Sequence, residues 1–426
     1  MASGILYPIF RPFAKVTIQI YFRKLHIKGR SKVPMDGPLI IASNHPNSFA
    51  EPVIFATHFK RRLHFLVRGD VFENVIIAWL LRQTNQIPIY RIRDGYKSLK
   101  RNNETFEACY NKLDENEAIV IFSEGLCILE KRLRPIKKGT ARLALGTIET
   151  KGQQEDFYIL PVGVNYTHGD RYRREVMVNV GQPIKVEDFW EDYRQDASAA
   201  VNNLTRSIED AIRPLVIEIV DKEREPLYND LMDIVNSIEP YGAIPTLKSD
   251  NQRFVRDHQL ADRVNTWTKE ETSTITESVN KLKASYPSNI PHYYLKNLER
   301  PDSYTWLWML LSPIGIVGVL LHSLPFTLSL WLGTKFRRSI EFYTAVRMAS
   351  LMIFTLALYL ALVIWSLSSG KYEWLGLVIA GPILGWAGAI YMEKLWSLIY
   401  HVKWRLQSDR SKISRLRDGV LEQIIP

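Results

Sequence analysis

The run from Met348 to Ser368 contains no charged side chain. About 20 apolar residues are enough to carry a helix across the hydrocarbon core of a bilayer. Two further apolar segments flank this run, at 305–333 and 374–400. Eight of the 11 tryptophans lie at or after residue 306, and tryptophan concentrates at the two edges of a bilayer. The sequence therefore predicts a helical membrane domain over residues 305–400.

The three apolar segments differ in what they predict. Residues 346–368 and 374–400 are each long enough to span a bilayer. Residues 305–333 contain Pro313 and Pro325, which interrupt a helix, and crossing twice needs about 40 residues. We therefore expect 346–368 and 374–400 to span and 305–333 to form a re-entrant or interfacial hairpin.

Positive charge in the loops predicts an orientation, because cytoplasmic loops are rich in Lys and Arg. The cations before the second segment are Lys335, Arg337, Arg338 and Arg347, and those after the third are Lys403, Arg405, Arg410, Lys412, Arg415 and Arg417. The connection between the second and third segments has only Lys371 and Glu373. We expect an integral membrane protein with residues 1–304 on the cytoplasmic face.

The net charge of +10 is compatible with nucleic acid or with anionic lipid. The cations cluster in membrane loops and in the tail, so we expect a lipid membrane and no nucleic acid as partner. Residues 1–30 carry Arg11 and Lys15 inside an apolar run, which is typical of an interfacial helix; the alternative is a helix packed on its own domain. Residues 401–426 form a basic amphipathic tail that would bind anionic lipid.

Residues 31–196 alternate short apolar runs with helical patterns, which predicts an α/β domain with a sheet flanked by helices. The predicted strands cover 38–43, 64–68, 87–91, 118–123, 157–166 and 175–181, and the predicted helices 71–84, 95–116 and 139–151. Residues 197–304 read as a charged helical region that carries no recognisable chemistry. Cys109 and Cys127, the two cysteines of the chain, read as free thiols in a reducing compartment.

A histidine follows the first of these strands in the stretch PLIIASNHPNSFAEPVIF, residues 38–55. An imidazole acts as a general base when a carboxylate fixes its tautomer. Six residues turn about 240° around a helix, so His45 can meet Glu51 only if His45 lies in the loop and Glu51 in the first turn of the next helix. The alternative is a capping box, in which Ser48 and Glu51 only bind backbone N–H groups.

Four stretches in the same order resemble the motifs of the PlsC-type glycerolipid acyltransferases: SNHPNSFAEP, IPIYRIRDG, IVIFSEGLC and ILPVGVNY. The resemblance covers roughly residues 30–190. The usual first motif has four residues between His and Asp; this chain has five and ends in Glu51, like a branch with longer spacing. Ser123 stands where the family usually has proline, and Leu126-Cys127-Ile128 replaces its Thr-Arg-Ser.

The resemblance implies a mixed sheet and a role for each matching residue. His45 and Glu51 would be catalytic, and Arg91 would bind the phosphate of the acceptor, with Lys137 and Arg134 as further cations. Glu124 would bind a glycerol hydroxyl or orient a basic residue. The other implied substrate contacts are Asn47 at the His45 loop, backbone amides near Gly125 for the oxyanion, and Pro161 at the acyl site. Taken alone, Arg91 and Lys137 would read as solvated charges.

The implied reaction moves a fatty acyl group from acyl-CoA or acyl carrier protein to glycerol 3-phosphate or lysophosphatidic acid, in phospholipid biosynthesis. The acyl donor is a co-substrate, and we expect neither a cofactor nor a metal site, because the nine histidines show no metal-binding spacing. The motifs do not separate the two acceptors. Two alternatives stay open: an acyltransferase for another lysolipid, such as an amino-acid lipid, and a catalytically inert membrane-binding scaffold.

Overall fold

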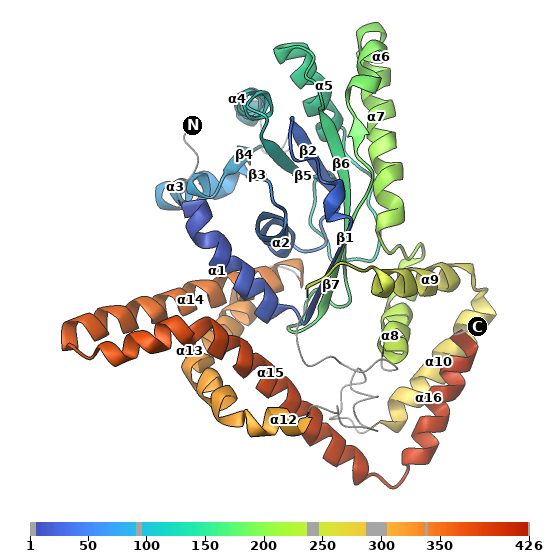
Figure 1. Ribbon diagram of the computed structural model, residues 1–426. Coiled ribbons are helices and arrows are strands. Elements are labelled where there is room, and N and C mark those ends of the chain that lie inside the picture. Colours follow the sequence, from blue (N-terminus) through green and yellow to red (C-terminus); the bar gives the residue numbers. More distant parts are fainter. Residues whose placement is uncertain (1–5, 91–95, 237–246, 287–304, 337–339, 425–426) are drawn as a thin grey trace.

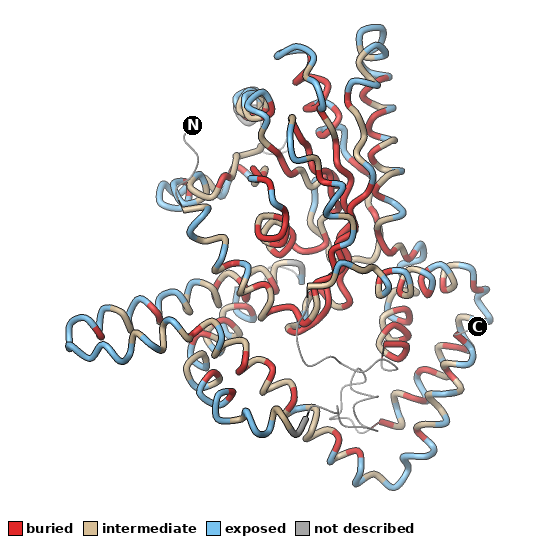
Figure 2. The backbone as a smooth tube through the Cα atoms, viewed as in Figure 1, coloured by how far each residue is buried: buried red, intermediate tan, exposed pale blue. Residues whose placement is uncertain are grey.

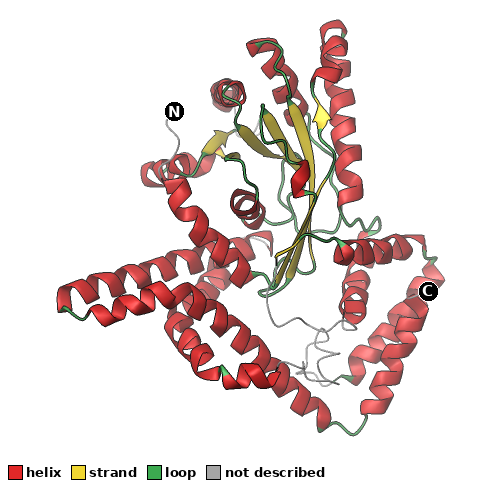
Figure 3. Cartoon of the chain, in the orientation of Figure 1, coloured by secondary structure: helices red, strands yellow, loops and turns green. Residues whose placement is uncertain are grey.

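The computed structural model describes residues 6–90, 96–236, 247–286, 305–336 and 340–424. A mixed sheet with helices on both faces forms one end of the molecule, and long apolar helices extend from the other (Figure 1). A group of shorter helices lies beside the sheet and carries the C-terminus (Figure 3). The predicted fold class, a mixed sheet flanked by helices and followed by a helical C-terminal region, is confirmed.

The sheet has nine strands, in the order β4-β3-β5-β2-β6-β7-β1-β9, with β8 paired to β6. They are β1 (Lys24–Lys28), β2 (Leu39–Ser43), β3 (Leu63–Arg68), β4 (Gln86–Ile89), β5 (Ala118–Phe122), β6 (Tyr158–Tyr166), β7 (Glu175–Val180), β8 (Ile184–Lys185) and β9 (Leu247–Lys248). All pairs are parallel except β6 with β7 and β6 with β8. Ser43 pairs with both Phe122 and Val162, so the carboxyl ends of β2 and β5 meet beside β6.

Helices cover both faces of this sheet because side chains alternate along a strand. Ile41 belongs to a core with α1 and α2, while its neighbour Ile40 belongs to a second core with α4, α5 and α7. The helices of this domain are α1 (Leu6–Tyr21), α2 (Ala50–His58), α3 (Val75–Gln83), α4 (Tyr96–Asp114), α5 (Gly139–Lys151), α6 (Trp190–Gln195) and α7 (Ala197–Ile212). Figure 2 shows that the buried backbone follows the sheet and α2.

Two predicted boundaries differ from the structure. Residues 24–28, placed with the N-terminal helix, form β1, which pairs with β7 and β9 inside the sheet. The helix α7 and the strand β9 were assigned by sequence to the helical region 197–304. In the structure, α7 packs in the second core of the α/β domain and β9 forms one edge of the sheet. The strand β1 is only five residues long and directly follows the helix α1, and β9 is only two residues long. Such short strands are difficult to predict from sequence.

A third core joins α8 (Glu225–Asn236), α9 (Gln252–Thr266), α10 (Lys269–Ser285) and α16 (Arg410–Ile424). Most of the tail, predicted as a basic amphipathic segment, forms the helix α16. However, Ile413, Val420 and Ile424 of α16 are buried in this core, so the apolar face of the tail packs on protein and is not available to lipid. Its cations remain on the other face.

The C-terminal region contains α12 (Thr305–Leu310), α13 (Ser312–Phe336), α14 (Ile340–Ser369) and α15 (Leu375–Arg405). Among the described residues, three helices are long and apolar enough to cross a membrane. The predicted hairpin over 305–333 is wrong in shape, because α13 is one continuous helix. Pro313 lies at its start, where a missing N–H costs nothing, and Pro325 is accommodated in its interior.

Candidate active site

The His45 loop leaves the buried strand β2 at the edge where β2 and β5 end. Asn44 fixes this exit, since its Nδ2 donates to the Val164 carbonyl (2.9 Å) and its Oδ1 accepts from the Val164 N–H (2.8 Å). Asn44 is 3% exposed. A buried side chain that completes both backbone groups of a neighbouring strand determines where the next residue, His45, can lie.

His45 and Glu51 come together as the spacing requires. Glu51 lies in the first turn of α2, and its Oε2 is 3.4 Å from Nδ1 of His45. The carboxylate is fully buried, while the imidazole is 16% exposed. The N-cap residue of α2 is Phe49 and not Ser48, and the Ala50 N–H at the start of the helix is bound by Asn47 Oδ1 (3.3 Å). Oε1 of Glu51 does accept from the Asn47 N–H (2.7 Å), so the carboxylate also holds the loop.

The imidazole of His45 is fixed from a second side. Its ring stacks on Phe122 of β5, with centroids 3.9 Å apart and planes 14° apart. Nδ1 is the ring nitrogen near Glu51, at 3.4 Å from Oε2 but without a hydrogen bond in the described structure, and Nε2 is the other nitrogen. This arrangement leaves Nε2 for a substrate proton.

Tyr166 lies at the same carboxylate and was not anticipated from the sequence. Burial, and then the charge of Glu51, raises the pKa of its phenol well above the usual range. Tyr166 therefore stays a neutral hydroxyl beside a buried acid. It ends the strand β6, a position that sequence alone does not connect to a loop more than 100 residues earlier.

Glu124 positions the His45 loop from β5. Its Oε2 accepts from the His45 N–H (3.2 Å) and its Oε1 from the Arg134 N–H (3.0 Å). The side chain is 4% exposed, and burial raises the pKa of this carboxyl. Both oxygens bind backbone N–H groups, and the implied role of Glu124, binding a glycerol hydroxyl or orienting a basic residue, stays a prediction.

Asn47 also shapes the loop. Its Nδ2 donates to the Gly169 carbonyl (3.1 Å), and its Oδ1 accepts from the Ala50 N–H (3.3 Å) at the start of α2. The residue is 1% exposed. Both ends of the amide are therefore bonded inside the protein, which supports a role in shaping the loop, while the predicted substrate contact stays a prediction.

Gly125 and Lys137 lie side by side after β5. Gly125 has φ +70°, a left-handed conformation that favours glycine, and its N–H donates to the Phe122 carbonyl (3.0 Å). That amide is therefore not available to an oxyanion. Lys137 is exposed beside this turn. Ser123, where the family usually has proline, shares a hydrogen bond of 2.9 Å with Thr140.

The remaining predicted site residues lie farther from this centre. Pro161 is buried in β6 opposite Ala42, and its carbonyl accepts from the Gly181 N–H. Arg134 pairs with Glu130 at 2.9 Å. Arg91 lies outside the described residues; the strand before it, β4, is separated from β2 by β3 and β5. No metal-binding group of His, Cys, Asp and Glu occurs in the described part of the chain.

The fold brings a histidine and a buried acid together where β2 and β5 end. Residues 24–165, about a third of the chain, match the Acyltransferase family. It is 26% identical to glycerol-3-phosphate O-acyltransferase 2 of Saccharomyces cerevisiae over 49% of this chain and 27% of the relative. It is 21% identical to glycerol-3-phosphate O-acyltransferase 1 of the same yeast, over 61% of this chain and 45% of the relative.

A plant relative and a solved structure are also similar. The chain is 27% identical to the chloroplastic 1-acyl-sn-glycerol-3-phosphate acyltransferase of Brassica napus, over 31% of this chain and 37% of the relative. The crystal structure of PlsC, the 1-acyl-sn-glycerophosphate acyltransferase of Thermotoga maritima, aligns with a TM-score of 0.36 at 16% identity, over 48% of this chain and 79% of that one. The chain spans less than half the length of each of these curated relatives.

Proposed function

We propose that this protein transfers a fatty acyl group from acyl-CoA or acyl carrier protein to glycerol 3-phosphate or lysophosphatidic acid, in phospholipid biosynthesis. The observation that carries the proposal is the 3.4 Å approach of Glu51 Oε2 to His45 Nδ1 at the end of a buried strand. The family match supports the reaction class, and the named relatives act on these two acceptors.

The pair supplies the chemistry of direct acyl transfer. Nε2 of His45 takes the proton of the acceptor hydroxyl while its oxygen attacks the thioester carbonyl. Glu51 stabilises the imidazolium that forms. The carbon–sulfur bond then breaks, and the imidazolium returns the proton to the leaving thiolate. The products are an ester and a free thiol, and no acyl group is attached to the protein.

To identify the acceptor, acyl transfer is measured in membranes that contain the wild-type chain or the His45→Ala variant. Glycerol 3-phosphate and lysophosphatidic acid are supplied in parallel, each with CoA and carrier-protein donors. We expect one acceptor to be acylated and the substitution to lower the rate by about 10²–10⁴-fold. His258→Ala, at a surface histidine that pairs with Asp262, is the matched control and should keep wild-type activity.

Absence of transfer to both acceptors, with a folded protein, would contradict the proposed substrates. Transfer to another lysolipid that still depends on His45 would keep the mechanism and replace the acceptor. Full activity of His45→Ala would remove the general base and with it the mechanism.

We also infer that the catalytic domain faces the cytoplasm. Thr344, near the start of α14, donates to the Gly169 carbonyl of the catalytic domain (2.6 Å), and α16, which follows α15, packs in the core with α10. The chain therefore enters α14 and leaves α15 on the same side of the membrane, the side on which the catalytic domain lies. Lys335 before α14 and the basic residues after α15 share that side, which the positive-inside rule assigns to the cytoplasm.

Cysteine labelling in sealed cells tests this orientation. An impermeant maleimide should label Lys371→Cys, between α14 and α15, and should label Lys412→Cys only after the membrane is opened. Labelling of Lys412→Cys in intact cells would reverse the orientation.

A further inference from the structure

The helix α3 of the catalytic domain has a large exposed apolar surface. Six large apolar side chains in α3 and just before it are each 42–82% exposed: Val71, Val75, Ile76, Ile77, Trp79 and Leu80. Single exposed apolar residues are normal on a protein surface, but a contiguous group of this kind marks a contact with another molecule or with a membrane.

The apolar residues extend around most of the helix. Successive helical residues are about 100° apart, so the consecutive residues 75–81 cover its whole circumference. The helix is well formed, because the Asn74 side chain accepts from the Ile76 N–H (3.0 Å) and the Ile77 N–H (3.1 Å). A helix that is apolar on all sides is normally buried in a protein core or in a membrane, yet only Ala78 of α3 is buried.

The helix α3 begins at the edge of the sheet that holds His45. The strand β3 is parallel to β5, and β5 is parallel to β2. The carboxyl ends of all three strands therefore lie along one edge. A short turn of 3₁₀ helix, Gly69–Phe72, follows the end of β3 and leads into α3.

This edge is joined to a membrane helix. The Gly169 carbonyl, beyond the end of β6, accepts from Asn47 Nδ2 of the His45 loop (3.1 Å) and from Thr344 Oγ1 of α14 (2.6 Å). Thr344 lies near the start of the candidate span Phe342–Ser369. The edge of the sheet at which His45 lies is therefore the edge next to the membrane.

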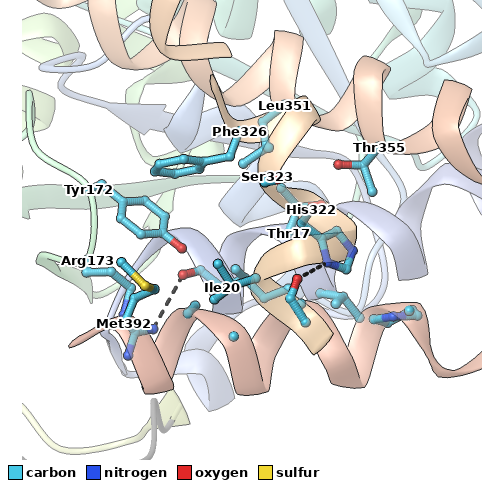
Figure 4. Close-up of a pocket in the computed structure, with 18 of the residues that line it drawn as sticks. Thr17, Ile20, Tyr172, Arg173, His322, Ser323, Phe326, Leu351, Thr355 and Met392 are labelled. Carbon is cyan, nitrogen blue, oxygen red and sulfur yellow. Dashed lines mark hydrogen bonds between the residues drawn. The ribbon is translucent and has the colours of Figure 1, made fainter. Parts of the chain in front are cut away.

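The helix α1 also joins the catalytic domain to the spans. It encloses a cavity of about 460 Å³ together with α13, α14 and α15. Figure 4 shows Thr17 and Ile20 of α1 around this space with His322, Leu351 and Met392 of the three spans. Figure 1 shows α3 at the left of the sheet, the side toward which α13 and α14 extend.

We propose that α3 inserts into the surface of the lipid bilayer, as a membrane contact in addition to the three spans. Val75, Ile76 and Trp79 would lie at the boundary between headgroups and acyl chains, which is where tryptophan concentrates. Arg82 is exposed at the end of the helix and would extend to the headgroups. The bilayer then meets the protein at the edge that holds His45. The proposal does not depend on the acyl-transfer reaction.

A spin label on the full chain measures the depth of α3. Ile76→Cys is introduced together with Cys127→Ala, and Cys109, which is 1% exposed, stays unlabelled. The labelled protein is placed in phosphatidylcholine nanodiscs with one chain in each disc. Collisions with oxygen, which concentrates in lipid, and with a water-soluble nickel chelate report the depth. We expect a label about 5–10 Å below the headgroup boundary.

Glu191→Cys is the control position in water. Its side chain is 70% exposed, and its helix α6 lies at the end of the molecule away from α14 (Figure 1). A label at Ile76 that the nickel chelate reaches as well as it reaches Glu191 would overturn the proposal. Shielding from both reagents would mean that protein covers α3 and would also overturn it. Spin–spin broadening in discs with two chains would then identify a second copy as the cover.

A charge on α3 should move the helix toward water, because a carboxylate is costly in hydrocarbon. With the label at Leu80→Cys, Ile76→Asp should raise the collision rate with the nickel chelate several-fold. Val255→Asp makes the same kind of change on α9, at an apolar residue that is 40% exposed, and should leave the rate unchanged. Equal rates in the two variants would contradict insertion of α3.

Discussion

The His45 loop and the helix α13 are held in place by opposite means. Around His45, buried polar side chains bind backbone groups: Asn44 holds Val164, Asn47 holds Gly169, and Glu124 holds His45 itself. Around α13, small residues let backbones approach, and a Cβ at Gly318 would collide with the Leu384 carbonyl oxygen of α15.

This difference explains what each region can do. Hydrogen bonds have strict distances and angles, so the polar anchors leave one geometry for the imidazole and its acid. Glycines set how near two helices come where they pack together. Where larger side chains follow along the same helices, space remains between them, and the 460 Å³ cavity occupies such a space. The first region holds one arrangement of atoms, and the second leaves an open volume between helices.

The largest effect is expected at Glu51. Replacing it with Gln keeps the shape but removes the charge that stabilises a protonated His45, so acyl transfer should fall on the order of 10³-fold. The rate is measured in membranes at matched protein level. Glu115→Gln, at a carboxylate that is 53% exposed, should behave like wild type. A loss of less than about threefold at Glu51 would mean that this acid does not assist the base.

Acid should unfold the catalytic domain before it disturbs the membrane helices. Burial lowers the pKa of His58 and of His64 to about 4, below the unfolded value near 6.5. Below pH 6.5 the unfolded chain binds a proton at each histidine that the folded chain does not bind. The free energy of unfolding is therefore highest above pH 6.5 and decreases as the pH falls from 6.5 toward 4. We expect a slope of roughly 1 kcal/mol per pH unit from each.

The measurement is the free energy of unfolding of the catalytic domain within the full chain, followed between pH 7 and pH 4 (the window set by these pKa values). The double variant with His58→Gln and His64→Gln should show a flatter dependence on pH than wild type. Parallel curves for the two proteins would show that other groups dominate acid unfolding.

Asn44→Ala removes both bonds to Val164 and leaves a buried N–H and C=O without partners. We expect a loss of stability of about 2–3 kcal/mol, together with a lower rate of acyl transfer, because the loop that carries His45 is no longer held. Asn203→Ala, at an exposed residue of α7, is the control. If Asn44→Ala keeps wild-type stability and rate, the polar anchors do not determine the loop geometry.

The smallest effect is expected in the membrane region. Gly318→Ala adds a methyl group against the Leu384 carbonyl, but alanine also favours a helix by about 1 kcal/mol over glycine, so the net loss should be about 1 kcal/mol. Gly376→Ala, with open space around it, should stabilise α15 slightly. Thermal unfolding in detergent measures both, and a Gly318 variant as stable as the Gly376 variant would contradict close packing there.

Much of the catalytic domain was predictable because its patterns are local. The six predicted strands and three predicted helices all occur, and the placing of His45 in a loop with Glu51 in the next helical turn is confirmed. The loop spacing alone required that arrangement. The strand β1 alternates polar and apolar residues as strands do, but it was missed because it is five residues long and directly follows a longer helical run; its parallel neighbours β7 and β9 hold it in the sheet.

The partners of the site residues were less predictable. That Glu124 binds two backbone amides, or that Asn44 reaches Val164 across 120 residues, depends on strand order, which one sequence does not contain. The continuous course of α13 was missed for a related reason. A proline inside a helix is tolerated when neighbouring helices cover the freed backbone, and sequence alone does not show those neighbours.

The central claim is that His45 and Glu51 act as one catalytic unit, and a double-mutant cycle on acyl transfer tests it most directly. The proteins are wild type, His45→Ala, Glu51→Gln and the double variant, each confirmed as folded. Groups that act as a unit are strongly non-additive, so we predict that the double variant is no slower than His45→Ala alone. A double variant slower by the product of the two single effects would show that the two residues act independently and would contradict the account.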